Sequence, residues 1–171
     1  DHEHKDWIDI LSFSQGIRVH QPGGGATGAT RRRGDVIMDD IVCVKELDKS
    51  SPKLAESVCN GRVIPSVTFE LARNTESGRV TYYKYELTNV MVTSYNVRIK
   101  VDENGNDVPV EDFSLNFEEI KVTYTEVDQA GKKKGNIEYS WKVEEGESMV
   151  APEDPSVIDE PVLVSPARLG N

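Results

Sequence analysis

Residues 113–124 read Phe-Ser-Leu-Asn-Phe-Glu-Glu-Ile-Lys-Val-Thr-Tyr, and this stretch decides the fold class. Apolar residues occupy every second position, at odd numbers up to Phe117 and at even numbers from Ile120 onward. Alternation with period two is typical of strands that have one buried face. The phase slip at Glu118 and Glu119 predicts a bulge or bend, the device by which a sheet is curved into a barrel.

The same alternation continues in both directions along the chain. Residues 67–71 and 83–87 alternate apolar and polar side chains, and residues 137–143 form a last clean strand. Through residues 90–92 the alternation is lost, which predicts a strand segment that is buried on both faces. Links rich in turn residues separate these strands, at 75–78, 102–105 and 129–135.

One short helix interrupts the strands. Ser51 is a suitable N-cap, and Gly61 is well placed to end the helix. Such a short helix is not stable alone, so we expect it to pack on the sheet through Leu54, Val58 and Cys59. The chain therefore reads as mainly β, an antiparallel β-barrel or sandwich with one short α-helix.

Length and charge limit the classes of protein that this chain can represent. Its 171 residues and 19.1 kDa are enough for one domain with a real core. Thirty acidic residues against twenty basic ones argue against a nucleic-acid binder or a protein of anionic membranes. No apolar stretch is long enough for a transmembrane helix. Two cysteines, Cys43 and Cys59, predict reduced, packed thiols rather than a disulfide scaffold.

Two segments do not have the composition of a core. Residues 21–34 are rich in glycine and have almost no side chain to bury, which predicts a flexible, projecting loop. Residues 148–171 are acidic and rich in proline, which predicts an extended, solvated tail. The predicted organisation is a barrel domain over residues 1–147 followed by this tail.

The glycine-rich loop has a superficial likeness to a nucleotide site. Residues 23–28 fit a loose Gly-x-Gly-x-x-Gly, but the lysine and hydroxyl pair of a phosphate-binding loop is absent. A strand-like segment rather than a helix follows, so we favour a flexible contact loop. The three arginines at its end either pair with acids of another copy or are solvated, and both interpretations stay open: Arg31, Arg32 and Arg33.

The sequence contains no convincing catalytic or metal site. His2, Glu3 and His4 are adjacent at a terminus with no fixed third or fourth ligand, and His20 has no partner acid or nucleophile in its pattern. No Gly-x-Ser-x-Gly elbow or other catalytic signature is present. We therefore expect no enzymatic activity, no cofactor and no metal, and we predict a binding or assembly module.

Several stretches, read in order, carry the pattern of one family. They are residues 4–16 (His-Lys-Asp-Trp-Ile-Asp-Ile-Leu-Ser-Phe-Ser-Gln-Gly), the glycine-rich loop, residues 47–54 (Leu-Asp-Lys-Ser-Ser-Pro-Lys-Leu), residues 61–71, residues 85–95 (Tyr-Glu-Leu-Thr-Asn-Val-Met-Val-Thr-Ser-Tyr) and residues 113–124. Over this length the chain resembles the hemolysin-coregulated protein (Hcp) family, the tube subunit of the bacterial type VI secretion system.

The resemblance implies a small β-barrel with one flanking helix that assembles into homohexameric rings. In this family the rings stack into a hollow tube, with spike, sheath and effector proteins as partners. The implied location is the bacterial cytoplasm during assembly, then the exterior, without a signal peptide. No nucleic acid and no membrane insertion are implied.

The resemblance also assigns candidate contact residues. The glycine-rich segment matches the extended loop of the family, which implies a ring-to-ring contact through Gly23, Gly24, Gly25, Gly28, Arg31, Arg32 and Arg33. Ser14 matches the strand position that faces the tube lumen, where short polar side chains contact cargo. The alternative is that Ser14 is an ordinary outward-facing strand serine.

The chain departs from the family pattern at both ends. The usual first strand, which precedes His4, is missing here, so we expect an open barrel unless residues precede Asp1. The tail extends beyond the usual end of the family. Two other functions remain as alternatives: a contractile phage tail tube protein, and an acidic extracellular β-sandwich adhesin that uses the tripeptide Arg33-Gly34-Asp35.

Overall fold

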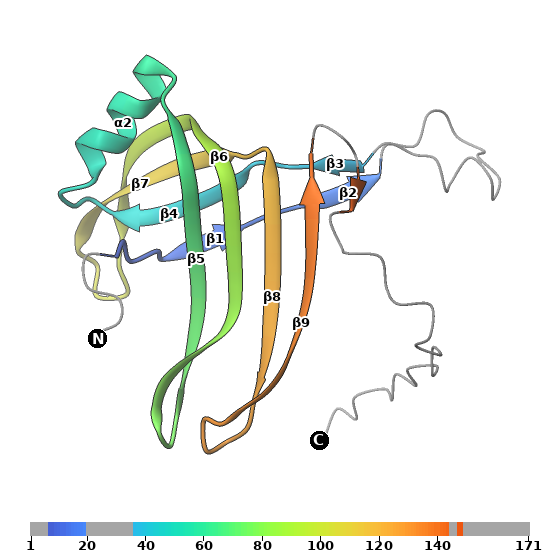
Figure 1. Ribbon diagram of the computed structural model, residues 1–171. Coiled ribbons are helices and arrows are strands. Elements are labelled where there is room, and N and C mark those ends of the chain that lie inside the picture. Colours follow the sequence, from blue (N-terminus) through green and yellow to red (C-terminus); the bar gives the residue numbers. More distant parts are fainter. Residues whose placement is uncertain (1–6, 20–35, 144–146, 149–171) are drawn as a thin grey trace, which may run out of the picture.

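The computed structural model describes residues 7–19, 36–143 and 147–148. In these residues the chain forms one helix and ten strands (Figure 1). They are β1 (Ser12–Ser14), β2 (Ile17–Val19), β3 (Val36–Met38), β4 (Ile41–Glu46), α2 (Ser51–Asn60), β5 (Val63–Thr75), β6 (Gly78–Val101), β7 (Asp107–Asn116), β8 (Glu119–Val127), β9 (Lys133–Lys142) and β10 (Glu147–Ser148).

All strand pairs are antiparallel, and the long strand β6 connects the two halves of the main sheet. The hydrogen-bonded order is β1-β4-β7-β6-β8-β9-β10, with β5 also paired to β6, and β2 and β3 form a separate ribbon. The first half of β6 lies between β5 and β8, whereas its second half pairs with β7. Figure 1 shows the consequence: β5, the first half of β6, β8 and β9 lie along one axis, and β1, β4 and β7 cross this axis.

A left-handed residue marks the place where β6 passes from one half of the sheet to the other. Asn89 has φ 51°, a conformation that asparagine tolerates better than most residues. Its side-chain amide donates to Oε2 of Glu118 at 2.6 Å, and the Glu118 amide donates to the Thr88 carbonyl at 3.1 Å. The bend in β6 and the link between β7 and β8 are therefore fixed together.

The mainly β fold with one short helix is confirmed, but the described strands do not close into a barrel. The phase slip at Glu118 and Glu119 corresponds to a bend, as predicted, and not to a bulge within one strand. It is the link between β7, which ends at Asn116, and β8, which begins at Glu119. The register shifts of the sheet lie elsewhere, at Leu71/Ala72, Val92/Ser94 and Glu126/Val127.

The core lies between the two crossing layers. Its fully buried members come from β4, β6, β7 and β8 and the link between the last two: Ile41, Cys43, Leu87, Val90, Val92, Phe113, Leu115, Phe117, Ile120 and Val122. Val90 and Val92 are buried, but Met91 between them is 37% exposed. The prediction that residues 90–92 are buried on both faces is therefore wrong, because the alternation of a one-sided strand continues through them.

The helix occupies the predicted place, with one correction at its start. Ser50, not Ser51, is the N-cap, and its side chain makes no capping hydrogen bond. Ser51 is the first helical residue, and its Oγ accepts a hydrogen bond from the Asp48 amide at 3.0 Å. Gly61 ends the helix as predicted, with φ 62°.

The two cysteines differ in environment. Leu54 and Val58 pack against the core as predicted, whereas Cys59 is exposed, so the expectation of two packed thiols is wrong for Cys59. A step of one residue turns a helical side chain by about 100°, which carries Cys59 out of the buried face. Cys43 is fully buried in β4, and desolvation raises its pKa to about 12. Both cysteines are free.

Candidate assembly surfaces

Strands β1, β4, β7 and the second half of β6 form one four-stranded layer. Its register runs continuously across the strands, from Ser14 to Val42, Ser114 and Ser94. Within the described ranges, β1 pairs only with β4, and beyond Met91 the strand β6 pairs only with β7. The layer thus has two free edges, and a free edge presents unpaired backbone groups to which another chain can bind.

The layer has an outer face that points away from the core, and Ser14 lies on it. Side chains alternate along β4, so Val42 points away from its buried neighbours. Its cross-strand partner Ser114 shares this face, although it is only 8% exposed. Val42 is 44% exposed and lies between Ser14 and Ser114 in the cross-strand row. The outer face is therefore built mainly from small side chains. A lumen-facing serine and an ordinary outward-facing serine would both lie on this face, so the role of Ser14 in cargo contact stays a prediction.

Arg98 and Asp112 form an ion pair on this outer face. Arg98 donates from Nε to Asp112 at 2.6 Å and from its terminal nitrogen to the other oxygen at 3.2 Å. This contact raises the pKa of Arg98 and lowers the pKa of Asp112. Nearby, Asp40 accepts hydrogen bonds from Thr93 at 2.6 Å and from Asn116 at 3.0 Å. The outer face therefore carries one arginine–aspartate pair, and small polar side chains hold the carboxylate of Asp40 beside it.

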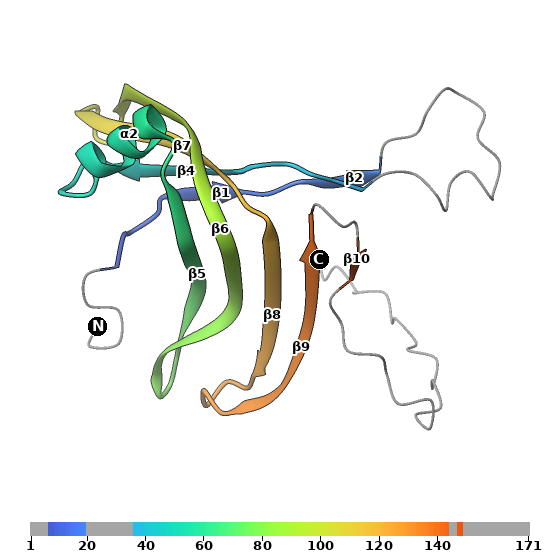
Figure 2. The same cartoon turned by 45° about the horizontal axis from the view of Figure 1, so that its top comes forward.

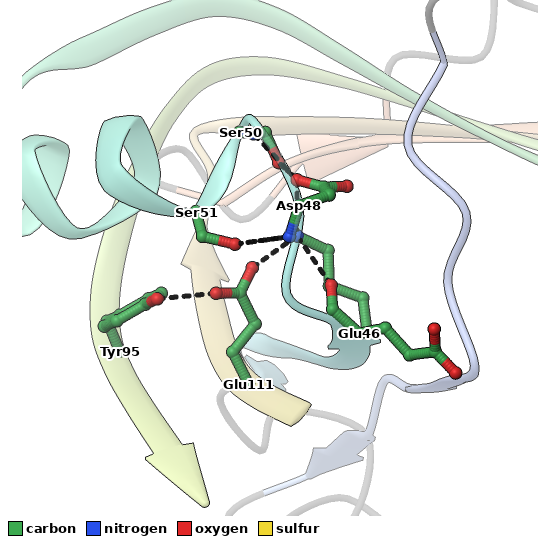
Figure 3. A network of polar contacts seen from close by, with 7 residues as sticks. Glu46, Asp48, Ser50, Ser51, Tyr95 and Glu111 are labelled. Atoms are coloured by element: carbon green, nitrogen blue, oxygen red, sulfur yellow. Dashed lines mark hydrogen bonds and ion pairs between the residues drawn. The ribbon is translucent and has the colours of Figure 1, made fainter. Parts of the chain in front are cut away.

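A buried ion pair lies on the opposite, core-facing side of the same layer. Lys45 and Glu111 are both 0% exposed, and Nζ of Lys45 is 2.5 Å from Oε1 of Glu111. The ammonium also contacts Oδ1 of Asp48 at 2.9 Å, the Glu46 carbonyl at 3.1 Å and Oγ of Ser51 at 3.3 Å. Figure 3 shows these partners converging from β4, β7 and the start of α2.

The same network extends to β6 through a tyrosine. The Tyr95 hydroxyl donates to Oε2 of Glu111 at 2.5 Å, and desolvation together with this bond raises the pKa of Tyr95 to about 12 (Figure 3). Ser50 donates to Oδ1 of Asp48 at 2.6 Å from its hydroxyl, which helps to lower the pKa of Asp48. A single polar cluster thus joins the start of the helix to three strands of the layer.

None of the predictions from the sequence included this polar cluster, although the strand alternation contains a signal for it. Ile41, Cys43 and Lys45 share one phase in β4, and Glu111 shares the phase of Phe113 and Leu115 in β7. Each charged residue therefore falls at a core position of its strand. Charged residues at core positions are rarely tolerated unless they are paired. The positions of Lys45 and Glu111 in the alternation therefore indicate a buried ion pair.

The residues predicted to form the ring-to-ring contact are not among those that the structure describes. Gly23, Gly24, Gly25, Gly28 and Arg31, Arg32 and Arg33 lie outside the described residues. The strands on either side of them are described: β2 and β3 pair with each other, with Val19 opposite Val36 at the last register position. Figures 1 and 2 show this ribbon at the far end of the layer from the helix.

The surface beside β5 contains two cavities. They have volumes of about 580 and 350 Å³ and lie between residues 7–13 and β5, and aromatic and aliphatic side chains such as Trp7, Ile10 and Phe69 line them.

Among the described residues there is no cluster of three or more potential metal ligands. In that same part of the chain, no helix is long and apolar enough to cross a membrane.

Within the described residues, the fold is a mainly antiparallel β domain with a four-stranded layer, two of whose edges are free to bind another chain. The family model described as "Type VI secretion system effector, Hcp" matches residues 1–124. The chain therefore belongs to the Hcp family of type VI secretion, as its resemblance implied. This membership confirms that it is a structural, non-enzymatic component and removes the phage tail and adhesin alternatives.

Individual relatives agree with this assignment. The chain is 27% identical over 144 residues to "Protein hcp1" of Pseudomonas aeruginosa, with 84% of this chain and 86% of that protein covered. A structure described as a type six secretion system protein superposes with a TM-score of 0.74 at 27% identity, covering 86% of this chain and 90% of the other. Hcp1 of E. coli EAEC 042 gives a TM-score of 0.60 at 26% identity, with 80% of each chain covered.

Proposed function

We propose that this protein is the tube subunit of a type VI secretion system and that it forms homohexameric rings that stack into a hollow tube. One observation carries the proposal: among the described residues, the four-stranded layer has free edges at both sides, on β1 and on the second half of β6. Pairing the β1 edge of one copy with the β6 edge of the next makes a head-to-tail contact. Contacts of this type close into rings when the rotation per copy is a whole fraction of a turn.

The same arrangement gives each face of the layer a role. The core-facing side is covered by the crossing layer and α2, so the outer face with Ser14, Val42 and Ser94 is the side left to line a lumen. Effector proteins would contact this face. Its small polar groups and paired charges suit a passage that accepts cargo of varied chemistry without holding it tightly.

The remaining parts follow from the family. Spike and sheath proteins are the other expected partners, and the tube assembles in the bacterial cytoplasm before it is secreted. We retain the domain boundary at residue 147 and treat residues 148–171 as an acidic appendage to the ring. No cofactor takes part in this function.

The first experiment measures the absolute mass in solution by light scattering on a sizing column, with negative-stain imaging of the same peak. A hexamer-sized mass with ring-shaped particles supports the proposal, and a clean monomer at high protein concentration contradicts it.

Cysteine cross-linking then tests which edges meet. In a Cys59→Ser background, which removes the exposed native thiol, Ser12→Cys is combined in turn with Ser94→Cys, Asn96→Cys or Arg98→Cys on β6. Oxidation should produce a ladder of cross-linked species that ends at six subunits for the pair in register. The matched control, Ser12→Cys with Glu138→Cys on β9, should remain monomeric on the gel. A ladder with the control alone would contradict the proposed edges.

Two further variants address the residues assigned by resemblance. Ser14→Gln should alter co-purification of effectors without changing ring mass, and equal cargo retention would remove Ser14 from the lumen. Replacing Gly24 and Gly25 with leucine should leave rings intact but reduce stacking. Unchanged tubes in micrographs would remove that loop from the ring-to-ring contact.

A further inference from the structure

The turns of two hairpins lie next to each other at the end of β5, β6, β8 and β9 that points away from β1, β4 and β7. One turn joins β5 to β6 at residues 76–77, and the other joins β8 to β9 at residues 128–132. Figures 1 and 2 both show the two turns together at this end. We call residues 73–79 and 126–135 together the double tip.

Direct contacts hold the two turns together. The Glu76 amide donates to the Gln129 carbonyl at 3.4 Å. Gly131 has φ 84°, and a Cβ at this position would lie 1.9 Å from Oγ of Ser77, so glycine allows the second turn to pack closely on the first. Asp128 accepts a hydrogen bond from a backbone amide of its own turn at 2.9 Å. The double tip is therefore a preformed surface.

Positive charge gathers on the double tip. This surface carries five cations against three acids, whereas the whole chain has a net charge of −10. The three lysines of the second turn are adjacent and exposed. The cations are Arg73, Arg79, Lys132, Lys133 and Lys134, and the acids are Glu76, Glu126 and Asp128.

The three lysines have no acidic partner, in contrast to cations elsewhere on the surface. Among the described residues, Lys132, Lys133 and Lys134 make no ion pair. Adjacent ammonium groups repel one another, and bound carboxylates would offset this repulsion. On other elements, five cations each lie between 2.6 and 3.2 Å from a carboxylate oxygen: Arg18, Lys53, Lys84, Arg98 and Lys121.

A cavity between the two turns lies beside the lysines. It has a volume of about 630 Å³ and is lined by residues 73–76 and 127–129. Arg73 is fixed in its wall, because its guanidinium donates to the Val127 carbonyl and lies 5.8 Å from the ring centre of Tyr82. Val127 in turn pairs with Lys133 across the β8–β9 ladder, which places the lysine run at the margin of the cavity.

The acids of the double tip define how a partner must lie. Glu76 and Asp128 both line the cavity, so the cavity suits a neutral peptide backbone and the lysines suit carboxylates. A nucleic acid or an anionic membrane carries negative charge far beyond this small surface and would meet the acids of the rest of the chain. A short acidic peptide segment avoids that repulsion.

We propose that the double tip binds a short acidic segment of a partner protein. The carboxylates of this segment contact Lys132, Lys133 and Lys134, and its backbone lies along the cavity beside Arg73. The site goes beyond the tube function and does not require ring formation, because it is remote from the free edges on β1 and β6.

Fluorescence anisotropy with a labelled oligoglutamate peptide tests the site. Wild type should bind this peptide despite its own negative charge, and added salt should weaken binding. Lys133→Gln with Lys134→Gln should reduce the affinity by about tenfold, which corresponds to about 1.4 kcal/mol. The matched control, Lys53→Gln with Lys121→Gln, makes the same change of charge on α2 and β8 and should stay within about twofold of wild type.

A variant of opposite sign sharpens the test. Glu76→Gln removes an acid from the cavity wall and should strengthen peptide binding by about threefold. Equal affinities for the Lys133/Lys134 variant and its control would contradict the site, as would a wild type that binds no peptide.

Two further measurements identify the occupant. An oligothymidylate of the same length that binds more tightly than the peptide, and loses affinity in the Lys133/Lys134 variant, would contradict an acidic protein segment. A variant that ends at Ser148 should bind the peptide as wild type does, and tighter binding would identify the acidic tail of this chain as the occupant in place of a partner. Ring mass by light scattering is read in parallel, so a chain that forms no rings contradicts the tube function while the titration still measures this site.

Discussion

The two halves of β6 belong to one strand but have different numbers of neighbours. The first half pairs with β5 on one side and β8 on the other, and Leu87 within it is 1% exposed. In the part of the chain that the structure describes, the second half pairs only with β7, and Ile99 within it is 60% exposed. The same alternating pattern therefore produces a core strand in one half and an exposed apolar row in the other, depending on what covers it.

The largest expected effect comes from the buried pair that holds the second half of β6 to the helix. Lys45→Met leaves the Glu111 carboxylate buried without its cation, and breaking such a pair costs about 3–5 kcal/mol of unfolding free energy. Equilibrium denaturation with urea measures this loss.

The double variant provides the control for this prediction. Lys45→Met with Glu111→Leu removes both charges, so it should be clearly more stable than Lys45→Met alone, because replacing a whole buried pair by apolar residues is often neutral. A double variant as unstable as the single one would show that the cost lies in packing and not in an unpaired charge.

The second prediction compares the two halves directly. Leu87→Ala leaves a cavity in the core and should reduce the free energy of unfolding by about 2–5 kcal/mol. Ile99→Ala should change it by about 0.5 kcal/mol or less, because Ile99 is exposed in one copy. Urea denaturation of dissociated subunits is the measurement, and equal losses for both variants would remove the distinction between core and surface.

The third prediction concerns the residue that divides the halves. Asn89 has φ 51°, so Asn89→Ala should destabilise by about 1–2 kcal/mol through backbone strain and loss of the amide contact to Glu118. Asn89→Gly relieves the strain but also loses the contact, so it should lie between wild type and Asn89→Ala. Thermal unfolding ranks the three proteins, and a glycine variant less stable than the alanine variant would contradict the role of the left-handed backbone.

The strands and the helix followed from the sequence because their signals are local. Alternation at 67–71 and 83–87, and Gly61 after Val58, depend on neighbours within a few residues. The phase slip at Glu118 correctly predicted a bend. It did not show that the bend links two strands, because alternation shows that a phase changes without showing whether the chain stays in the same strand. Which strand lies beside which is a property of distant residues.

The site was less predictable for a physical reason. Ser14 has no local feature that separates a lumen-facing serine from any outward one, so its role came from resemblance. Lys45 and Glu111 are separated by many residues, and their pairing depends on the β4–β7 register, which places Lys45 opposite Glu111. The exposure of Val97 also depends on distant residues, since Val97 and Leu87 lie in the same strand, yet Val97 is 50% and Leu87 1% exposed.

The smallest expected effect is the pH dependence of the cluster that anchors α2. Partial burial by itself would raise the pKa of Asp48, but hydrogen bonds from Ser50 and Lys45 outweigh it and lower the pKa to about 2. The folded-state pKa lies below the unfolded one, so Asp48 stabilises the protein above pH 4 and this contribution is lost as the pH falls toward 2. The Asp48 side chain is 41% exposed, so solvent screening keeps the contribution modest. Urea denaturation at several pH values should show a shallower decrease between pH 4 and pH 2 for Asp48→Asn, and a decrease that begins at higher pH for Ser50→Ala. Identical pH profiles for all three proteins would show that the Lys45 cluster holds the second half of β6 without Asp48.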